Sequence, residues 1–127
     1  MSLKEVTSFL FDLDGTLTDY EAGCEAGLRA ALKILNEERE RPLDFDIFQE
    51  AYDAVIVAES TWSSSGGFRL PARENRIRRF KMLFDAFGFQ AGPVLQDMAD
   101  AYGIGRATGT RLYPDVRPLL DYMVDKY

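Results

Sequence analysis

Two aspartates stand one residue apart in this sequence, directly after an apolar run. The stretch FLFDLDGTLTD, residues 9–19, places Asp12 and Asp14 before Gly15 and Thr16. While the backbone stays extended, both carboxylates point to one side, where they repel each other unless a cation offsets their charge. Mg²⁺ prefers oxygen ligands and bridges carboxylates to phosphates, so the pattern predicts a metal-assisted phosphate site. Gly15 permits close backbone approach, and Thr16 offers an anion a hydroxyl and an amide.

A simpler alternative for the same residues is a strand that ends in an Asp-Gly turn. Asp12 and Asp14 would then be solvated, or would cap the helix that follows. An EF-hand calcium loop is excluded, because counting from Asp12 the positions that require glycine and glutamate hold Leu17 and Gly23. The chain has no histidine, which excludes Ser-His and Cys-His nucleophile pairs and leaves acid–base chemistry to carboxylates.

The composition is that of one acidic globular domain. The 127 residues are 46% hydrophobic, which is enough to build a core. A net charge of -6 and a pI near 4.6 argue against non-specific binding to nucleic acid. The single cysteine, Cys24, excludes an internal disulfide and, without histidine, the usual zinc sites. No apolar stretch is long enough to cross a bilayer and the N-terminus lacks a signal-peptide pattern, so we expect a cytoplasmic protein without a membrane partner.

The spacing of apolar residues predicts the elements that position the aspartates. Residues 6–11 read as a short strand, and because Phe9, Leu10 and Phe11 are consecutive we expect it to be covered on both faces. Helical spacing predicts five helices. The first begins at residue 20 and ends in a charged segment at 37–41, and the others cover 45–60, 72–87, 93–102 and 115–126. The first four suggest a small bundle. Serine, glycine and proline predict a loop at 61–71 and a glycine-rich connection at 103–114.

This arrangement leaves the predicted strand without a neighbour. A strand that is apolar on both faces needs hydrogen-bonding partners at both edges, yet the sequence shows only one strand. A parallel neighbour is expected after a crossover helix such as 115–126, where the sequence ends. We therefore expect the unpaired strand to be a surface for self-association.

The segment FDLDGTLTD resembles the first motif of the haloacid dehalogenase-like (HAD) hydrolases, written hhhDxDGT with h apolar, and it matches at residues 9–16. The helical insertion after the motif resembles the all-helical cap of that superfamily, and LYPDVRPLLDYM resembles its return to the core. The resemblance implies an α/β fold with an incomplete Rossmann-like core formed by residues 1–18 and 104–127. A four-helix cap at 19–103 would be inserted into this core.

The resemblance also implies a chemistry for each matched residue. Asp12 would be the nucleophile that forms an aspartyl-phosphate, and Asp14 the general acid and base. Mg²⁺ would sit on the Asp12 carboxylate and the Asp14 backbone carbonyl, with Gly15 and Thr16 at the phosphate. The second aspartate is characteristic of the phosphatases and phosphomutases, whereas the dehalogenases lack it. The implied substrate is a small phosphorylated metabolite such as phosphoglycolate, a sugar phosphate or a nucleoside monophosphate.

The remaining family motifs are a Ser or Thr after a second strand, a Lys and an acidic pair, and all would lie beyond Tyr127. We therefore interpret the chain as the N-terminal part of such an enzyme and predict little or no phosphatase activity from it alone. Two other functions stay open. One is a phosphomutase of the same family, and the other is a non-catalytic helical interaction module that retains a relic motif.

A basic run surrounds the third predicted helix and consists of Arg69, Arg73, Arg76, Arg78, Arg79 and Lys81. One interpretation is a solvated helix face opposite Ile77 and Phe80. The other is that one or two of these side chains, with Arg73 and Arg76 as the candidates, bind an anionic part of the substrate.

Overall fold

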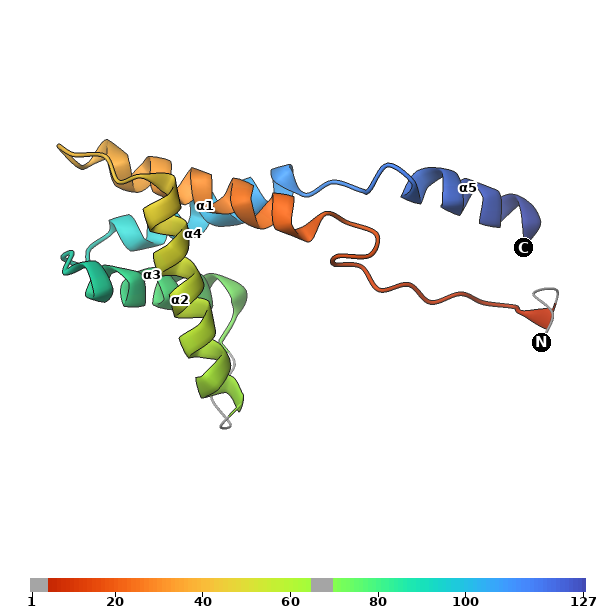
Figure 1. Ribbon diagram of the computed structural model, residues 1–127, viewed down its shortest axis with the longest axis horizontal. Coiled ribbons are helices and arrows are strands. Elements are labelled where there is room, and N and C mark those ends of the chain that lie inside the picture. The colour runs from red at the N-terminus through yellow and green to blue at the C-terminus, as the bar shows by residue number, and fades with distance from the viewer. Residues whose placement is uncertain (1–4, 65–69) are drawn as a thin grey trace.

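The computed structural model describes residues 5–64 and 70–127. Within these ranges the elements are five helices in chain order, α1 (Tyr20–Glu37), α2 (Phe45–Ser64), α3 (Ala72–Phe87), α4 (Val94–Gly109) and α5 (Val116–Lys126). The first four gather into a bundle, while α5 and the N-terminal segment extend from one end of it (Figure 1). None of the helices in the described ranges combines the length and apolar character that a membrane crossing requires.

The closest helix pair is α1 with α4, which lie side by side (Figure 1). Glycines make this approach possible, because Gly27 of α1 and Gly105 of α4 present bare backbone to the opposite helix. A Cβ atom at Gly105 would lie 2.8 Å from the carbonyl oxygen of Ala26 and 3.2 Å from the Cα of Gly27. No side chain fits between backbones at these distances, so small residues set the spacing of the two helices.

Aromatic rings fill the core between α2, α3 and α4. The ring of Phe80 lies 6.3 Å from that of Phe48 and 5.8 Å from that of Tyr52, and the rings of Tyr52 and Tyr102 lie 6.0 Å apart. Phe48 and Phe80 are completely buried. Burying each such side chain contributes about 1.5–3 kcal/mol, so this cluster is the main force that joins α2 and α3 to the pair α1 and α4.

The helix ends follow from local sequence. The side chain of Asp19 caps α1, since its Oδ1 accepts a hydrogen bond from the amide of Ala22 at 3.0 Å. Gly88 ends α3 in the left-handed region with a φ of 71°, directly after the predicted helix at 72–87. Two predicted connections are wrong in part. Helix α4 continues to Gly109 through the first half of 103–114, and α2 continues to Ser64 through the first residues of 61–71.

The predicted α/β class is wrong for the described residues, which are helical and contain no strand or sheet. Residues 6–11, the expected strand, are extended but pair with no neighbour, and Leu10 is fully exposed. The β-type pairing in the described ranges is confined to isolated bridges of Thr18 with Asp14 and with Leu112. A strand forms only where another backbone supplies hydrogen bonds, so without a neighbour the apolar run stays irregular.

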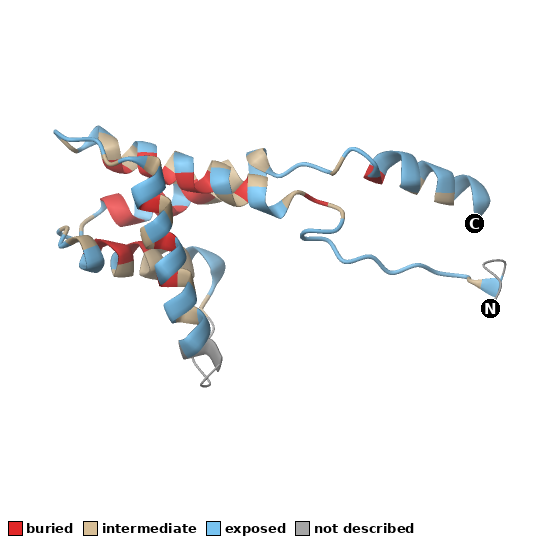
Figure 2. Cartoon of the chain, viewed as in Figure 1, coloured by how far each residue is buried: buried red, intermediate tan, exposed pale blue. Residues whose placement is uncertain are grey.

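The two connections to the bundle lie against each other. The amide of Asp19 donates to the carbonyl of Arg111 at 2.8 Å, and the amide of Tyr113 donates to the carbonyl of Leu17 at 3.1 Å. Beyond this contact, α5 packs against none of the other helices in the described ranges. Figure 2 shows the consequence, because buried residues concentrate in α1 to α4 while the N-terminal segment and α5 are mostly exposed. The division into core segments 1–18 and 104–127 and a cap at 19–103 stays a prediction.

Candidate functional site

A tight turn follows the two aspartates and is closed by one carbonyl oxygen. The carbonyl of Leu13 accepts hydrogen bonds from the amides of Leu17 and Thr18, both at 3.0 Å, and from the Thr18 hydroxyl at 3.2 Å. Gly15 sits inside the turn at a φ of 77°, a conformation that side chains with a Cβ rarely adopt. Thr18 is buried, which anchors the turn at the start of α1. The sequence therefore builds a defined loop and not a flexible tail at residues 13–18.

Asp12 and Asp14 are both exposed on this turn. The Thr16 hydroxyl donates to Oδ2 of Asp12 at 3.4 Å, so the structure brings these two residues together. The predicted role of Thr16 at a phosphate stays a prediction. Neither aspartate forms an ion pair with the described residues. Two carboxylates without a cationic partner remain able to bind a cation from solution.

The fit of Mg²⁺ to this turn depends on the ligands that the chain offers. No group of three or more Asp, Glu, Cys or His side chains in the described ranges is placed to hold a metal ion. Mg²⁺ is commonly bound by one or two carboxylates, with water and substrate phosphate completing its shell. The described residues therefore form no all-protein cage, and binding of Mg²⁺ by Asp12 and Asp14 together with water and phosphate stays a prediction.

Asp14 borders an open hollow of about 590 Å³ where the N-terminal turn meets α1 and the end of α4. Its lining residues are Asp14, Gly15, Tyr20, Glu21, Arg106 and Tyr113. Arg106 is the cation of this hollow, and its guanidinium lies 5.0 Å from the ring centroid of Tyr20. An anion in this hollow would meet the guanidinium of Arg106 and the carboxylates of Asp14 and Glu21. It would therefore need a metal ion to neutralise the remaining negative charge.

The sequence missed Arg106 as a site residue because it was assigned to a glycine-rich connection. A signal was present, since Arg106 follows Tyr102 by one helical turn and α4 carries both. The glycines at 103, 105 and 109 obscured that periodicity. Their role is packing against neighbouring side chains and α1, which the sequence alone does not reveal.

The other predicted anion-binding residues, Arg73 and Arg76, lie elsewhere, against α4. Nε of Arg73 is 2.7 Å from a carboxylate oxygen of Asp100, and this contact raises the pKa of Arg73 and lowers the pKa of Asp100. The Arg76 guanidinium lies 5.4 Å from the ring centroid of Tyr102. Both border a separate hollow with Gly103 and do not line the one beside Asp14.

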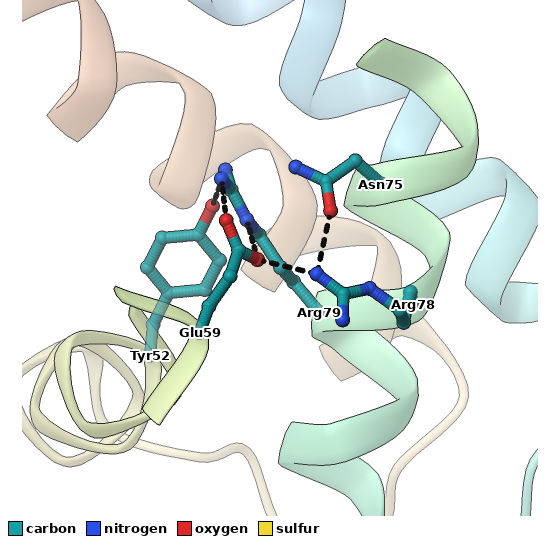
Figure 3. A network of polar contacts seen from close by, with 5 residues as sticks. All are labelled: Tyr52, Glu59, Asn75, Arg78 and Arg79. Atoms are coloured by element: carbon teal, nitrogen blue, oxygen red, sulfur yellow. Dashed lines mark hydrogen bonds and ion pairs between the residues drawn. The ribbon is translucent and has the colours of Figure 1, made fainter. Parts of the chain in front are cut away.

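Two further arginines of the basic run hold α3 to α2 (Figure 3). Arg79 donates through Nε to Oε2 of Glu59 at 2.7 Å, and Nη2 of Arg78 donates to the same oxygen at 3.0 Å and to Asn75 at 2.9 Å. Arg79 also reaches the Tyr52 hydroxyl at 3.5 Å. The hydrogen bond from Arg79 is the main cause that lowers the pKa of Glu59, and the same bond raises the pKa of Arg79. These two arginines are therefore structural, while Arg69 lies outside the described residues.

The geometry amounts to a surface turn with two unpaired carboxylates, a glycine at positive φ and a nearby guanidinium. Such a set can bind a hydrated divalent cation and place a phosphate next to it. No family model matches the chain, and no curated protein or solved structure matches it either. The resemblance of residues 9–16 to the HAD motif therefore rests on the sequence of those residues alone.

Proposed function

We propose that this chain carries the nucleophile turn of a Mg²⁺-dependent phosphomonoester hydrolase acting on a small phosphorylated metabolite. The observation that carries the proposal is the turn itself, in which Asp12 and Asp14 are exposed and form no ion pair with the described residues, and in which Asp14 borders a hollow that contains Arg106. The proposal includes the cytoplasmic location that was expected from the sequence.

The two carboxylates would divide the chemistry between them. A carboxylate oxygen of Asp12 attacks phosphorus, the bond from phosphorus to the alcohol oxygen breaks, and Asp14 gives its proton to that oxygen. Asp14 then takes a proton from water, whose oxygen attacks phosphorus and releases inorganic phosphate from Asp12. Each aspartate ends the cycle in the state in which it began.

Asp12 and Asp14 are also the residues that would hold the metal. Bound Mg²⁺ would neutralise charge on the transferred phosphoryl group. Arg106 would meet the phosphate from the α4 side of the hollow. Thr16 holds Asp12 through its hydroxyl, which orients the nucleophile.

A covalent phosphate on Asp12 is the direct test of this proposal. Incubating the chain with acetyl phosphate and Mg²⁺ should give a mass increase of one phosphate, which is lost in Asp12→Asn. Asp44→Asn is the matched control, because Asp44 and Asp46 are also exposed and one residue apart but lie at the start of α2. Absence of an adduct that depends on Asp12 would overturn the proposal.

Turnover is a separate question from phosphorylation. The described residues place one guanidinium in the hollow beside Asp14, and no third carboxylate joins Asp12 and Asp14 as a metal ligand. We therefore expect the 127-residue chain to hydrolyse an aryl phosphate very slowly even with Mg²⁺ in excess. Rapid release of phosphate that Asp12→Asn abolishes would contradict this expectation.

A second candidate function, an interaction module, is favoured by apolar residues at the end of the molecule that Figure 2 shows to be mostly exposed. Leu10 is fully exposed next to Phe9 and Phe11, and Tyr122 and Val124 of α5 are also exposed. The extended segment at 6–11 has unpaired backbone groups and apolar side chains, which suits edge-to-edge pairing with a second copy.

Light scattering coupled to gel filtration tests this self-association. The wild-type chain should form a dimer that Leu10→Asp dissociates, whereas Val57→Asp should have no effect because Val57 is an exposed residue on α2, in the bundle. A wild-type chain that is monomeric at all concentrations would overturn this candidate.

A further inference from the structure

The Arg106 side chain is held by an aromatic ring and not by a carboxylate. Its guanidinium lies over the ring of Tyr20, 5.0 Å from the centroid, and it forms no ion pair with the described residues. Arg73, by contrast, is paired with Asp100 at 2.7 Å. A ring face attracts a guanidinium without cancelling its charge, so Arg106 keeps its charge and its N–H donors for an anion.

Neighbouring groups fix the backbones of both residues. Tyr20 is the first residue of α1, directly after the cap at Asp19, and its amide donates to the carbonyl of Thr18 at 3.0 Å. The carbonyl of Arg106 accepts hydrogen bonds from the amide of Thr110 at 3.0 Å and from its hydroxyl at 2.7 Å. The remaining freedom lies in the long side chain of Arg106, and contact with the ring of Tyr20 restricts it.

Tyr20 also borders the aspartate turn. Tyr20 and Arg106 line the hollow of about 590 Å³ together with Asp14 and Gly15. A hydrogen bond with Cys24 is the main cause that raises the pKa of Tyr20, followed by burial. The charge of Arg106 lowers the same pKa and the charge of Asp14 raises it, so the Tyr20 hydroxyl lies within electrostatic range of both groups.

The same hollow offers Arg106 competing partners. Asp14 and Glu21 line it, and a carboxylate binds a guanidinium more strongly than a neutral ring does. An Arg106 side chain that turned to Glu21 would lose the charge that an anion requires. In the structure the guanidinium contacts Tyr20 and pairs with neither carboxylate.

We propose that Tyr20 is a positioning residue, whose ring holds the Arg106 guanidinium without an ion pair at the hollow beside Asp14, where the guanidinium binds the oxygens of a phosphate group. This inference deepens the proposed function and rests on it for the identity of the anion. The contact of the ring with the guanidinium rests on the geometry alone. The sequence does not indicate Tyr20, because its partner lies on another helix.

Inorganic phosphate is the probe for this role. Titration of the chain with phosphate in the presence of Mg²⁺, followed by NMR, should shift the backbone amide of Gly15 and the Nε–H resonance of Arg106. Tyr20→Leu should weaken this binding about two- to fivefold, the effect of losing a cation–π contact at a partly exposed site. Tyr20→Phe keeps the ring and should bind phosphate as the wild type does. Tyr122→Leu is the matched control, because Tyr122 is exposed and its ring lies 5.9 Å from Nζ of Lys126 on α5, outside the hollow.

A double-mutant cycle separates positioning from a general loss of structure. Arg106→Gln should weaken phosphate binding, and adding Tyr20→Leu to it should weaken binding no further, because the ring then has no guanidinium to hold. Without phosphate, the Nε–H resonance of Arg106 should lose its upfield ring-current shift in Tyr20→Leu and keep that shift in Tyr20→Phe.

Three results would each overturn the inference. The wild type could show no phosphate-dependent shift at Gly15 and Arg106, Tyr20→Leu could bind phosphate as tightly as the wild type, or the effect of Tyr20→Leu could persist in full in Arg106→Gln.

Failure of the proposed function gives a different result. If phosphate binding depends on Tyr20 and Arg106 while acetyl phosphate leaves no adduct on Asp12, the positioning role holds and the phosphatase proposal fails. If the adduct forms at the same rate in the wild type, Tyr20→Leu and Arg106→Gln, the chemistry of Asp12 holds and the inference fails.

Discussion

The contact between α1 and α4 gives the sharpest test of the packing, because it depends on a glycine with no space around it. A Cβ atom at Gly105 would lie 2.8 Å from the carbonyl oxygen of Ala26 and 2.9 Å from the Cβ of Ala30. Neither atom belongs to a flexible side chain, so Gly105→Ala must push the two helices apart.

The size of the effect follows from two opposing contributions. Overpacking of this kind costs about 1–3 kcal/mol, while alanine in place of glycine in a helix gains about 1 kcal/mol. Because two contacts of the added Cβ would be shorter than 3.0 Å, the overpacking cost at Gly105 lies in the upper part of that range. We therefore expect Gly105→Ala to lower the free energy of unfolding by about 1–2 kcal/mol, which corresponds to a fall of about 4–8 °C in Tm for each kcal/mol in a bundle of this size.

Gly103 is the matched control on the same helix. A Cβ atom there would lie 2.9 Å from Nη1 of Arg76, which is the end of a flexible side chain and can move. The gain in helix propensity then outweighs a weakened contact of Arg76 with Tyr102, so Gly103→Ala should be neutral or stabilising by up to about 1 kcal/mol.

Urea unfolding followed by far-ultraviolet circular dichroism measures both variants, with the slope against urea checked for each. The reasoning is refuted if Gly105→Ala is as stable as the wild type. It is also refuted if Gly103→Ala loses as much stability as Gly105→Ala, because the loss would then not come from the contact with α1.

Three further predictions concern polar groups. Folding lowers the pKa of Glu59, so the stability that its carboxylate contributes is present above the ordinary pKa of 4.5 and is lost as pH falls below that value. Glu59→Gln should therefore lower the free energy of unfolding by about 1–2 kcal/mol at neutral pH and make that free energy depend less on pH in the acid range. Glu25→Gln, at an exposed position, should have neither effect. Folding raises the pKa of Tyr102, so stability should fall as pH rises above 10.0, and Tyr102→Phe should reduce this loss in alkaline urea titrations. Asp19→Ala should lower the free energy of unfolding by about 1 kcal/mol, because it removes the side-chain cap of α1. Asp115→Ala should lower it less, because Asp115 makes no side-chain cap hydrogen bond on α5. Equal losses of stability in thermal melts would contradict this prediction.

The sequence alone predicted those structural features that depend on a few consecutive residues. The start of α1 at Asp19, the end of α3 at Gly88 and the stripes of four amphipathic helices were all predictable, because capping, positive φ and helical periodicity are properties of a few consecutive residues. The predicted extent of α4 was wrong because glycine signals a loop locally, while here it serves the contact with α1.

The same distinction between local and long-range effects applies to the residues of the candidate site. Asp12, Asp14, Gly15 and Thr16 were found from spacing, since two carboxylates and a glycine within five residues form their own turn. Arg106 could not be found, because it is far from Asp14 in the sequence and lines the same hollow only through the packing of α4 on α1.

The sequence by itself determined which segments are helical, where most of them begin and end, and that two aspartates meet a glycine in a turn. Only the tertiary structure decided that the apolar run at 6–11 is not a strand, because strand pairing requires a partner backbone that the described residues do not supply. It also decided which charges are free. Arg78 and Arg79 both pair with Glu59, whereas Asp12 and Asp14 form no ion pair with the described residues, since side chains distant in sequence meet only when helices pack.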